Sequence, residues 1–206
     1  MTKIKLCGLT RACDIQAANE LLPSYIGFVF APQSRRYLSP QKAAELKKQL
    51  HPQILAAGVF VNEAPHTVAK LLNDGVCDLA QLHGDEDESY IRLLRSLTPK
   101  PAIKAFCIAS QADVAAALTC TADYVLLDSG AGTGSAFDWG LIRQFDRPYF
   151  LAGGLGRQNV RDAIETLHPY AVDVSSGIET DGVKDLEKME AFVRAVKSAD
   201  GKEAIQ

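Results

Sequence analysis

The sequence predicts a parallel α/β protein whose eight strands close into a single (β/α)8 barrel. Short apolar runs alternate with longer amphipathic segments along the 206 residues, and this alternation is typical of strand–helix units that build a parallel sheet. Eight such units are the number that closes a TIM barrel. No Pro/Gly/Ser-rich linker divides the chain, so we expect one domain over residues 1–206. The alternative is an open doubly wound sheet, although no G-x-G-x-x-G motif follows the first strand.

The apolar runs predict the strands, and several are nearly continuous, as is typical of parallel strands buried on both faces. We expect strands at residues 4–7, 25–30, 54–60, 79–82, 102–106, 124–127, 149–152 and 171–174. The segments between them carry apolar residues at the three- and four-residue spacing of an amphipathic helix, and Ser39-Pro40 adds a helix-start signal. We expect helices at residues 13–22, 41–50, 65–73, 86–97, 113–118, 139–145, 160–167 and 185–197.

Composition excludes several classes of protein. Hydrophobic residues make up 47% and charged residues 23% of the chain, which excludes disorder as a description of the whole. The formal net charge of -3 disfavours a nucleic-acid partner, whose binding proteins are usually basic. The longest apolar runs, such as residues 54–61, are shorter than the roughly 20 residues that cross a bilayer. The first residues become polar too early for a signal peptide, so we expect no membrane partner and a cytoplasmic location.

The cysteines do not suggest a disulfide framework or a zinc site. Their number, five, is odd, their spacing is irregular, and no CxxC pair occurs. His and carboxylate residues show no clustering at metal-ligand spacing, so we expect no metal. In a barrel the active site lies after the carboxyl ends of the strands. This rule places Cys7 and Cys107 at the functional rim, Cys77 and Cys120 near the opposite face, and Cys13 early in a helix.

Small residues follow the seventh and eighth strands. These strands end in Ala152-Gly153-Gly154-Leu155 and in Asp173-Val174-Ser175-Ser176-Gly177. Phosphate sites recur after strands seven and eight of this fold, because small residues let an anion approach backbone N–H groups. We therefore predict a phosphate site there, with two ordinary tight turns as the alternative. The candidate phosphate-binding residues are Gly153, Gly154, Ser175, Ser176 and Gly177.

Other polar side chains follow strands two, four and six. Asp128 ends a strand and could act as an acid or anchor the following loop. Arg35-Arg36 follows strand two, and a guanidinium suits carboxylate or phosphate recognition, although one arginine of the pair is expected to be a solvated surface residue. Gln81 and His83 are candidates for substrate binding, with a structural role as the alternative for His83.

The rim thiol and the rim carboxylate suggest proton transfer on a phosphorylated sugar. A thiolate at Cys7 and a carboxylic acid at Asp128 make a plausible base and acid pair. Isomerisation is one reaction of this kind, and a covalent thiol mechanism is another.

Motifs in a specific order carry a resemblance over nearly the whole chain. They are Lys3-Ile4-Lys5-Leu6-Cys7-Gly8-Leu9-Thr10, Gly27-Phe28-Val29-Phe30, Ser34-Arg35-Arg36-Tyr37, Gly58-Val59-Phe60-Val61-Asn62, Gln81-Leu82-His83-Gly84-Asp85, Leu127-Asp128-Ser129, Gly132-Thr133-Gly134, Phe137-Asp138-Trp139, residues 151–155 with Asn159-Val160, and residues 173–179 with Gly182, Lys184 and Asp185. The ordered set resembles the phosphoribosylanthranilate isomerase family of tryptophan biosynthesis. One departure is Ser135-Ala136, where the family commonly has Lys and Thr.

The resemblance implies an Amadori rearrangement without a cofactor. It converts N-(5-phosphoribosyl)anthranilate, a small phosphosugar substrate, into 1-(2-carboxyphenylamino)-1-deoxyribulose 5-phosphate. By the resemblance, Cys7 is the general base, Asp128 the general acid, Arg36 binds the anthranilate carboxylate, and the loops around Gly154 and Ser176-Gly177 hold the phosphate. The required protonation states are opposite to those of the free side chains at pH 7, and proton exchange and substrate-induced burial both remain open as routes to them. Both a monomer and a homodimer are compatible with the sequence.

Two other functions remain as alternatives. One is a related phosphate-binding barrel enzyme such as indole-glycerol-phosphate synthase, whose chemistry needs a rim lysine that only the first rim segment could supply. The other is a non-catalytic phosphosugar-binding barrel, and the presence of both Cys7 and Asp128 argues against it.

Overall fold

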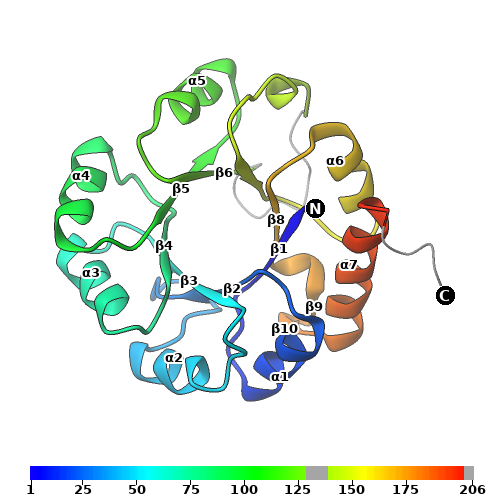
Figure 1. Cartoon of the computed structure of the whole chain (residues 1–206), viewed down its shortest axis with the longest axis horizontal. Coiled ribbons are helices and arrows are strands. Elements are labelled where there is room, and N and C mark those ends of the chain that lie inside the picture. The colour runs from blue at the N-terminus through cyan, green and yellow to red at the C-terminus, as the bar shows by residue number, and fades with distance from the viewer. Residues whose placement is uncertain (129–138, 202–206) are drawn as a thin grey trace.

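Eight parallel strands form a closed barrel, and the helices surround it on the outside (Figure 1). The computed structural model describes residues 1–128 and 139–201. Neighbouring strands are hydrogen bonded in sequence order, and the last strand pairs with the first to close the ring. The (β/α)8 barrel predicted from the alternation of apolar and amphipathic segments is therefore confirmed.

All eight predicted strands are present, with ends that differ from the prediction by at most one residue. The barrel strands are β1 Lys3–Cys7, β2 Tyr25–Val29, β3 Leu55–Phe60, β4 Leu79–Leu82, β5 Ala102–Cys107, β6 Tyr124–Asp128, β7 Tyr149–Leu151 and β8 Ala171–Val174. Pairing with neighbours sets these ends. Cys107 and Asp128 are register partners, so β5 and β6 each extend one residue beyond their apolar runs. This extension places Asp128 on the strand itself.

Local capping sets where the helices begin. The helices are α1 Ala12–Leu21, α2 Pro40–Lys47, α3 Pro65–Asn73, α4 Glu88–Leu97, α5 Gln111–Thr119, α6 Val160–Leu167 and α7 Leu186–Ala199, with 3-10 helices η1 Trp139–Ile142 and η2 Ser176–Ile178. The Asp87 carboxylate accepts from the Tyr90 N–H, so α4 begins two residues later than predicted. A capping box between Ser110 and Asp113 starts α5 two residues earlier than predicted.

The sixth unit and the segment after β8 depart from the prediction. A helix was expected at residues 139–145, but the described residues there form only η1, and the Phe145 N–H donates to the Ile142 carbonyl in a 3-10 bond of 3.0 Å. Gly140 disfavours a helix and Pro148 follows closely, so the segment is too short to nucleate an α-helix. The prediction of eight helices is therefore wrong, because the described residues hold only α1 to α7 as α-helices.

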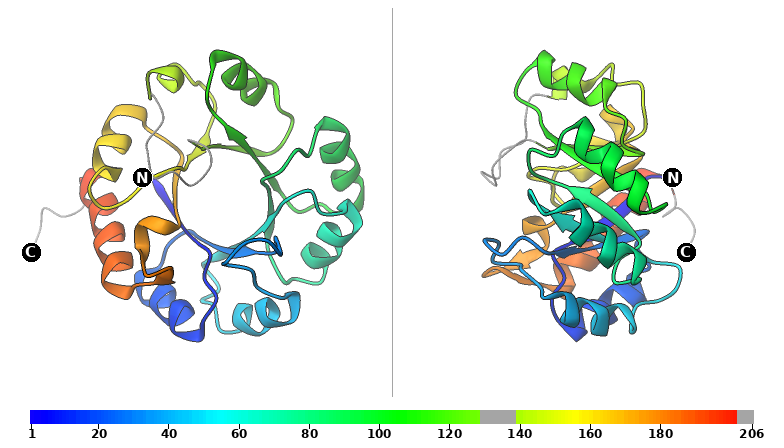
Figure 2. Two further views of the ribbon diagram at one scale, coloured as in Figure 1. Left: turned by 180° about the vertical axis from the view of Figure 1, so that it is seen from behind. Right: turned by 90° about the vertical axis from the view of Figure 1, so that its left-hand side faces the viewer.

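A small hairpin after β8 was not predicted. Strands β9 Glu179–Thr180 and β10 Val183–Lys184 pair antiparallel around Asp181 and Gly182, which have φ angles of 51° and 79°. An Asp-Gly pair with positive φ is the preferred sequence of a tight two-residue hairpin turn, so this signal could have revealed the hairpin. The side view in Figure 2 places the hairpin and the segment after β2 at the same end of the barrel.

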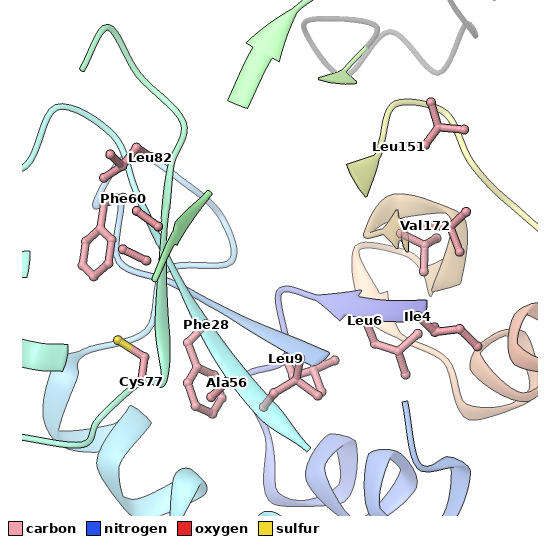
Figure 3. Packing of buried hydrophobic residues seen from close by; sticks show 14 of the residues in the cluster. Ile4, Leu6, Leu9, Phe28, Ala56, Phe60, Cys77, Leu82, Leu151 and Val172 are labelled. Carbon is pink, nitrogen blue, oxygen red and sulfur yellow. The ribbon is translucent and has the colours of Figure 1, made fainter. Parts of the chain in front are cut away.

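The hydrophobic core has two parts. The larger part lies between the strands and the helices, and Figure 3 shows members of it such as Leu6, Phe28 and Phe60. The smaller part fills the barrel interior towards the amino-terminal ends of the strands. Four aromatic rings contact one another there, with centroids 5.3 to 5.8 Å apart. These rings belong to Tyr25, Tyr124, Phe150 and Tyr170. The aromatic cluster closes the amino-terminal end of the barrel and leaves the opposite end for polar residues.

No helix in residues 1–128 or 139–201 has both the length and the apolar character needed to cross a membrane.

The two faces of α4 should respond differently to truncation. Ile91 is 1% exposed in the core, whereas Leu93 on the same helix is 42% exposed. Ile91→Ala should lower the free energy of unfolding by about 2–4 kcal/mol through lost burial and a residual cavity. Leu93→Ala, the matched control, should change it by less than about 0.5 kcal/mol. Urea unfolding of both variants tests the assignment of faces, and equal losses would contradict it.

Candidate active site

A cavity of about 580 Å³ opens at the carboxyl ends of the barrel strands. Its volume lies within the roughly 300–1,000 Å³ usual for small-molecule sites. The predicted site residues that line it are Cys7, Arg36, Gln81, His83, Asp128, Gly153, Gly154, Ser175 and Ser176. The barrel therefore brings into one cavity residues that the sequence spreads over more than 160 positions. Gly177 is the predicted site residue that does not line the cavity.

Cys7 ends β1 and points into the barrel, where its side chain is buried. Gly27 on β2 makes room for it, because a Cβ at Gly27 would lie 2.6 Å from the Cys7 Sγ. Burial raises the pKa of the Cys7 thiol, and the Asp173 carboxylate adds to this. The cations of Lys5 and Lys184 act in the opposite direction but do not cancel the effect of burial. The thiol is therefore protonated near neutral pH when the cavity holds no substrate.

Asp128 ends β6 and lines the same cavity as Cys7. Its Oδ2 lies 3.7 Å from the His83 Nε2, and the other ring nitrogen of His83 is 2.8 Å from the Gln81 Nε2. Desolvation by the cavity walls, together with the Lys5 and Lys104 cations, holds the pKa of His83 below its ordinary value against the pull of Asp128. His83 is therefore uncharged near neutral pH, and its contact with Asp128 is between a neutral ring and a carboxyl group.

The loops after β7 and β8 form another part of the cavity wall. Gly153 and Gly154 have φ angles of 89° and 62°, which favour glycine. Asn159 holds this loop, because its side chain accepts from the Gly156 N–H and donates to the Gly154 carbonyl. The Ser175 hydroxyl donates to the Cys7 carbonyl, which ties the second loop to β1.

Gly177 joins these two loops. A Cβ at Gly177 would lie 2.0 Å from the carbonyl oxygen of Leu155. No side chain can occupy that space without moving the backbone, so Gly177 lets the loop after β8 pack directly on the loop after β7. The structure thus gives Gly177 a packing position behind the cavity wall.

Glu179 on β9 organises the cations near the cavity, and sequence reasoning missed it. The Arg36 Nε and Nη2 donate to its two carboxylate oxygens at 2.6 and 2.9 Å. Arg35 and Lys184 also bind this carboxylate, at 2.7 and 2.6 Å. The Arg35 side chain is 61% exposed, so it is a surface arginine as expected, but it is ion paired. Gly8 allows the approach of Arg36, because a Cβ there would lie 2.5 Å from the Arg36 Cδ.

The network lowers the pKa of Glu179. Burial alone would raise the pKa of this carboxyl, but hydrogen bonds from Arg36 and Lys184 outweigh burial and hold the pKa at about 2. Glu179 is therefore charged at all pH values near neutrality. Lys184 reaches further and donates to the carbonyl of Ser175 at 2.9 Å. One carboxylate thus links the arginine of the cavity rim to the loop after β8.

A second charged pair lies inside the barrel and was also missed. Lys5 on β1 is fully buried and donates to the Asp173 Oδ2 on β8 at 2.7 Å. Within the described residues, the other oxygen of Asp173 and the Oε1 of Gln81 have no hydrogen-bond partner. Strand periodicity could have revealed the pair, because Lys5 alternates with Ile4 and Leu6 and shares its face with Cys7.

The remaining cysteines lie away from the cavity. All five cysteines are free thiols. Cys107 ends β5 but is exposed and does not line the cavity. Cys77 is buried beside Gly58, and burial raises its pKa to about 12. Cys120 is buried and Cys13 is exposed on α1. Position in the barrel thus separates Cys7 from the other four.

The glycine-rich loop after Asp128, including Ser135 and Ala136, lies outside the described residues. Among residues 1–128 and 139–201, no group of three or more His, Cys, Asp or Glu side chains could hold a metal ion.

Comparison with known proteins gives one consistent result. A family model described as N-(5'phosphoribosyl)anthranilate (PRA) isomerase matches residues 4–195. An N-(5'-phosphoribosyl)anthranilate isomerase from Endomicrobium trichonymphae is 42% identical, covering 96% of this chain and 100% of the relative. One from Caldanaerobacter subterraneus is 41% identical, covering 96% and 98%.

Solved structures agree with these sequence matches. The phosphoribosyl anthranilate isomerase of Thermotoga maritima superposes with a TM-score of 0.87 at 36% identity, covering 98% of this chain and 100% of that one. A phosphoribosyl anthranilate isomerase in complex with reduced 1-(o-carboxyphenylamino)-1-deoxyribulose 5-phosphate superposes with a TM-score of 0.85 at 36% identity, covering 98% and 100%.

Removing the Glu179 charge should destabilise the protein in a pH-dependent way. Glu179→Gln leaves Arg36 and Lys184 without their shared carboxylate, so we expect a loss of about 2 kcal/mol or more at pH 7. Because the folded-state pKa is about 2 and the ordinary value is 4.5, this stabilisation is complete above pH 4.5 and is lost as the pH falls towards 2. Urea unfolding of wild type and variant at pH 7, 4 and 3 should show the difference narrowing below pH 4.5. A difference that stays constant over this range would contradict the role of the carboxylate charge.

Proposed function

The chain belongs to the N-(5'-phosphoribosyl)anthranilate isomerase family, and on that premise we propose that Cys7 and Asp128 are the general base and the general acid of its reaction. The enzyme isomerises N-(5'-phosphoribosyl)anthranilate in tryptophan biosynthesis, yielding 1-(2-carboxyphenylamino)-1-deoxyribulose 5-phosphate. The observation that carries the assignment is that a buried thiol and a carboxyl group, from β1 and β6, line one cavity. Such a pair can serve two sites of proton transfer on a single substrate.

Ring opening is the first step of the proposed mechanism. Protonated Asp128 donates its proton to the ring oxygen of the ribose, and the bond between that oxygen and C1′ breaks. The lone pair of the anthranilate nitrogen forms a double bond to C1′, which gives a cationic Schiff base. Asp128 is left as a carboxylate beside neutral His83, which lies 3.7 Å away.

Proton removal from C2′ is the second step. The Cys7 thiolate takes the proton, and the electron pair of the C–H bond forms a C1′–C2′ double bond while the nitrogen regains its lone pair. The resulting enolamine becomes the ketose when C1′ gains a proton and the C2′ hydroxyl loses one. Because burial raises the pKa of Cys7, the thiol must lose its proton within the enzyme–substrate complex. Direct exchange between Cys7 and Asp128 and burial of the pair by the substrate remain the two routes to the required states.

Arg36 is proposed to bind the anthranilate carboxylate. The guanidinium lines the cavity rim, and Glu179 holds its Nε and one Nη. A guanidinium held on one edge can present its remaining N–H groups to a second carboxylate. Glu179 then fixes the direction in which Arg36 faces the substrate.

The loops after β7 and β8 are proposed to bind the phosphate. Gly153, Gly154, Ser175 and Ser176 line the cavity with little side-chain bulk, and α6 begins at Val160 soon after the first loop. Backbone N–H groups and a helix amino terminus favour an anion. Gly177 supports this site by holding the loops together. Gln81 and His83 are proposed to contact the sugar between the phosphate and the anthranilate ring.

We also propose the location, domain organisation and oligomeric state of the enzyme. We infer that it works in the cytoplasm, because all five cysteines are free thiols and reducing compartments keep thiols in that state. We infer one domain over residues 1–206, because the described residues build a single barrel. The cavity lies within one chain, so the site is compatible with a monomer or a homodimer, and a related Thermotoga maritima protein is described both as a dimer and as generated monomers.

Loss of either proton-transfer group should abolish most of the activity. Cys7→Ala and Asp128→Asn should each lower kcat by about 100-fold or more, because general acid–base groups contribute that much. The assay generates phosphoribosylanthranilate in situ and follows its conversion by purified protein. Cys107→Ala is the matched control, since Cys107 also ends a strand but lies outside the cavity, and it should retain activity. Full activity in either site variant, with normal folding, would reject the assignment.

Loss of Arg36 should weaken recognition of the substrate carboxylate. Arg36→Ala should raise KM for phosphoribosylanthranilate by about 10- to 100-fold, because a charge-assisted bidentate contact is lost. A substrate built from aniline, which lacks the carboxylate, should show a much smaller change. Arg35→Ala is the comparison variant, because Arg35 also binds Glu179 and lines the cavity, but its side chain is 61% exposed and it should affect KM less than Arg36→Ala. Equal effects of Arg36→Ala on both substrates would refute the carboxylate contact.

A further inference from the structure

We propose that Lys5, buried below Cys7 and bonded to Asp173, is a positioning residue that stabilises the thiolate form of Cys7. The proposal rests on the proposed role of Cys7 as the general base. Lys5 acts through Cys7 and is not itself assigned a contact with the substrate. It is one of the two charged side chains in the barrel interior that sequence reasoning did not single out.

The strand geometry places Lys5 directly below Cys7. Side chains alternate along a strand, so Lys5 and Cys7 both point into the barrel while Ile4 and Leu6 pack outside it. Lys5 is the register partner of Asp173 on β8, and its Nζ lies 2.7 Å from the Asp173 Oδ2. Lys5 is thus the neighbour of Cys7 on the inner face of β1, and the charges of the two groups interact. One ammonium group is thus bonded to a carboxylate and lies on the same side of the strand as the thiol.

Packing does not explain why the charged pair of Lys5 and Asp173 lies inside the barrel. Lys5 is 0% exposed, and removing an ammonium from water costs several kcal/mol even when it is paired. Most other interior positions of the barrel are apolar, including Ala57, Leu126 and Phe150. Asp173 is itself incompletely bonded within the described residues, since its Oδ1 has no partner. A buried pair of this kind is weak evidence for stability, so we assign it a role in the chemistry above it.

Four charged groups act on Cys7, and Lys5 is the cation that shares its strand and its inward face. Asp173 approaches from β8, Lys184 from β10 and Arg36 from the segment after β2. Lys184 is bound by Glu179 and Ser175, and Arg36 is bound by Glu179. Burial raises the pKa of Cys7, Asp173 raises it further, and Lys5 lowers it. Without Lys5, burial and the Asp173 carboxylate would both oppose formation of the thiolate.

Lys5 and Asp173 therefore have different roles. Lys5 supplies the positive charge that balances the thiolate when the proton leaves Cys7. Asp173 holds the Lys5 Nζ in place and keeps Lys5 charged in a buried environment. A nearby opposite charge favours the ionised form of an acid, so the cation increases the fraction of enzyme that holds a competent base.

The first test removes both charges together, so that neither is left unpaired. Lys5→Met with Asp173→Asn replaces the ammonium by an unbranched apolar chain and the carboxylate by a neutral side chain of the same shape. The thiol pKa is measured from the pH dependence of iodoacetamide alkylation, followed by mass spectrometry of the peptide that contains Cys7. We expect a thiol pKa at least about one pH unit higher than in the wild type, which means about tenfold less thiolate at a given pH. The loss of kcat/KM at pH 7 should be partly restored at higher pH.

Asp173→Asn alone is the matched control for the double variant. It retains the cation and removes an anion, so the thiol pKa should stay the same or fall. A folded double variant with the thiol pKa of the wild type would overturn the proposal. If the pair had a purely structural role, the folded double variant would keep wild-type activity and an unchanged pH profile. That result would also overturn the proposal.

A measurement on the unaltered Lys5 covers the case in which these variants do not fold. The Lys5 ammonium is followed by ¹³C and ¹⁵N NMR during a pH titration of the wild type and of Cys7→Ala. We expect the Lys5 resonance to shift at the pH where alkylation detects the thiolate, and this shift should be missing in Cys7→Ala. A Lys5 resonance that does not respond at that pH would refute the interaction. Neither readout needs turnover, so failure of Cys7 as the base would appear in the kinetics alone.

Discussion

The pairing of β8 with β1 is the constraint on which the rest of the structure depends. It closes the parallel sheet, so the carboxyl ends of all eight strands meet around one cavity. Closure also sets the register that puts Lys5 beside Asp173, although 168 positions separate them in the chain. The aromatic cluster fills the amino-terminal end of the interior, and Lys5, Asp173 and Cys7 lie nearer to the cavity. An open sheet with the same elements would leave β1 and β8 at opposite edges and would separate these groups.

Ion pairs fix the positions of the charged side chains at the site. Two buried carboxylates each hold cations at the site. Glu179 binds Arg36, which lines the cavity, and Lys184, while Asp173 binds the buried Lys5. Each pair fixes a long, flexible side chain before the substrate arrives, which lowers the entropic cost of binding and catalysis. The β9–β10 hairpin is part of this arrangement, because it carries both Glu179 and Lys184. Its sequence departs from the simple strand–helix repeat because it serves the site and does not extend the barrel.

The sequence predicted the strands more accurately than the helices and the roles of single residues. The apolar runs marked all eight strands to within one residue at each end, because burial on both faces leaves a strong local signal. The prediction of a helix in the sixth unit was wrong. The amphipathic spacing around Trp139 does not outweigh the low helix propensity of a glycine and the shortness of the segment. The hairpin at Asp181-Gly182 was overlooked although its turn signal is local. Cys7, Arg36 and Asp128 were placed in one cavity by their positions after the strands, whereas Glu179 and Asp173 were not singled out, because their partners are distant in the sequence.

By itself the sequence determined the strand–helix alternation, the motifs after the strands and, through them, the family of the enzyme. These features depend on periodicity, capping and residue order, which are local properties of the chain. The tertiary structure alone decided which side chains face each other across the barrel and which cation neutralises which carboxylate. It also decided that Gly177 supports the cavity from behind while Gly153 and Gly154 line it. These outcomes follow from strand register and barrel closure, which join residues that no local pattern connects.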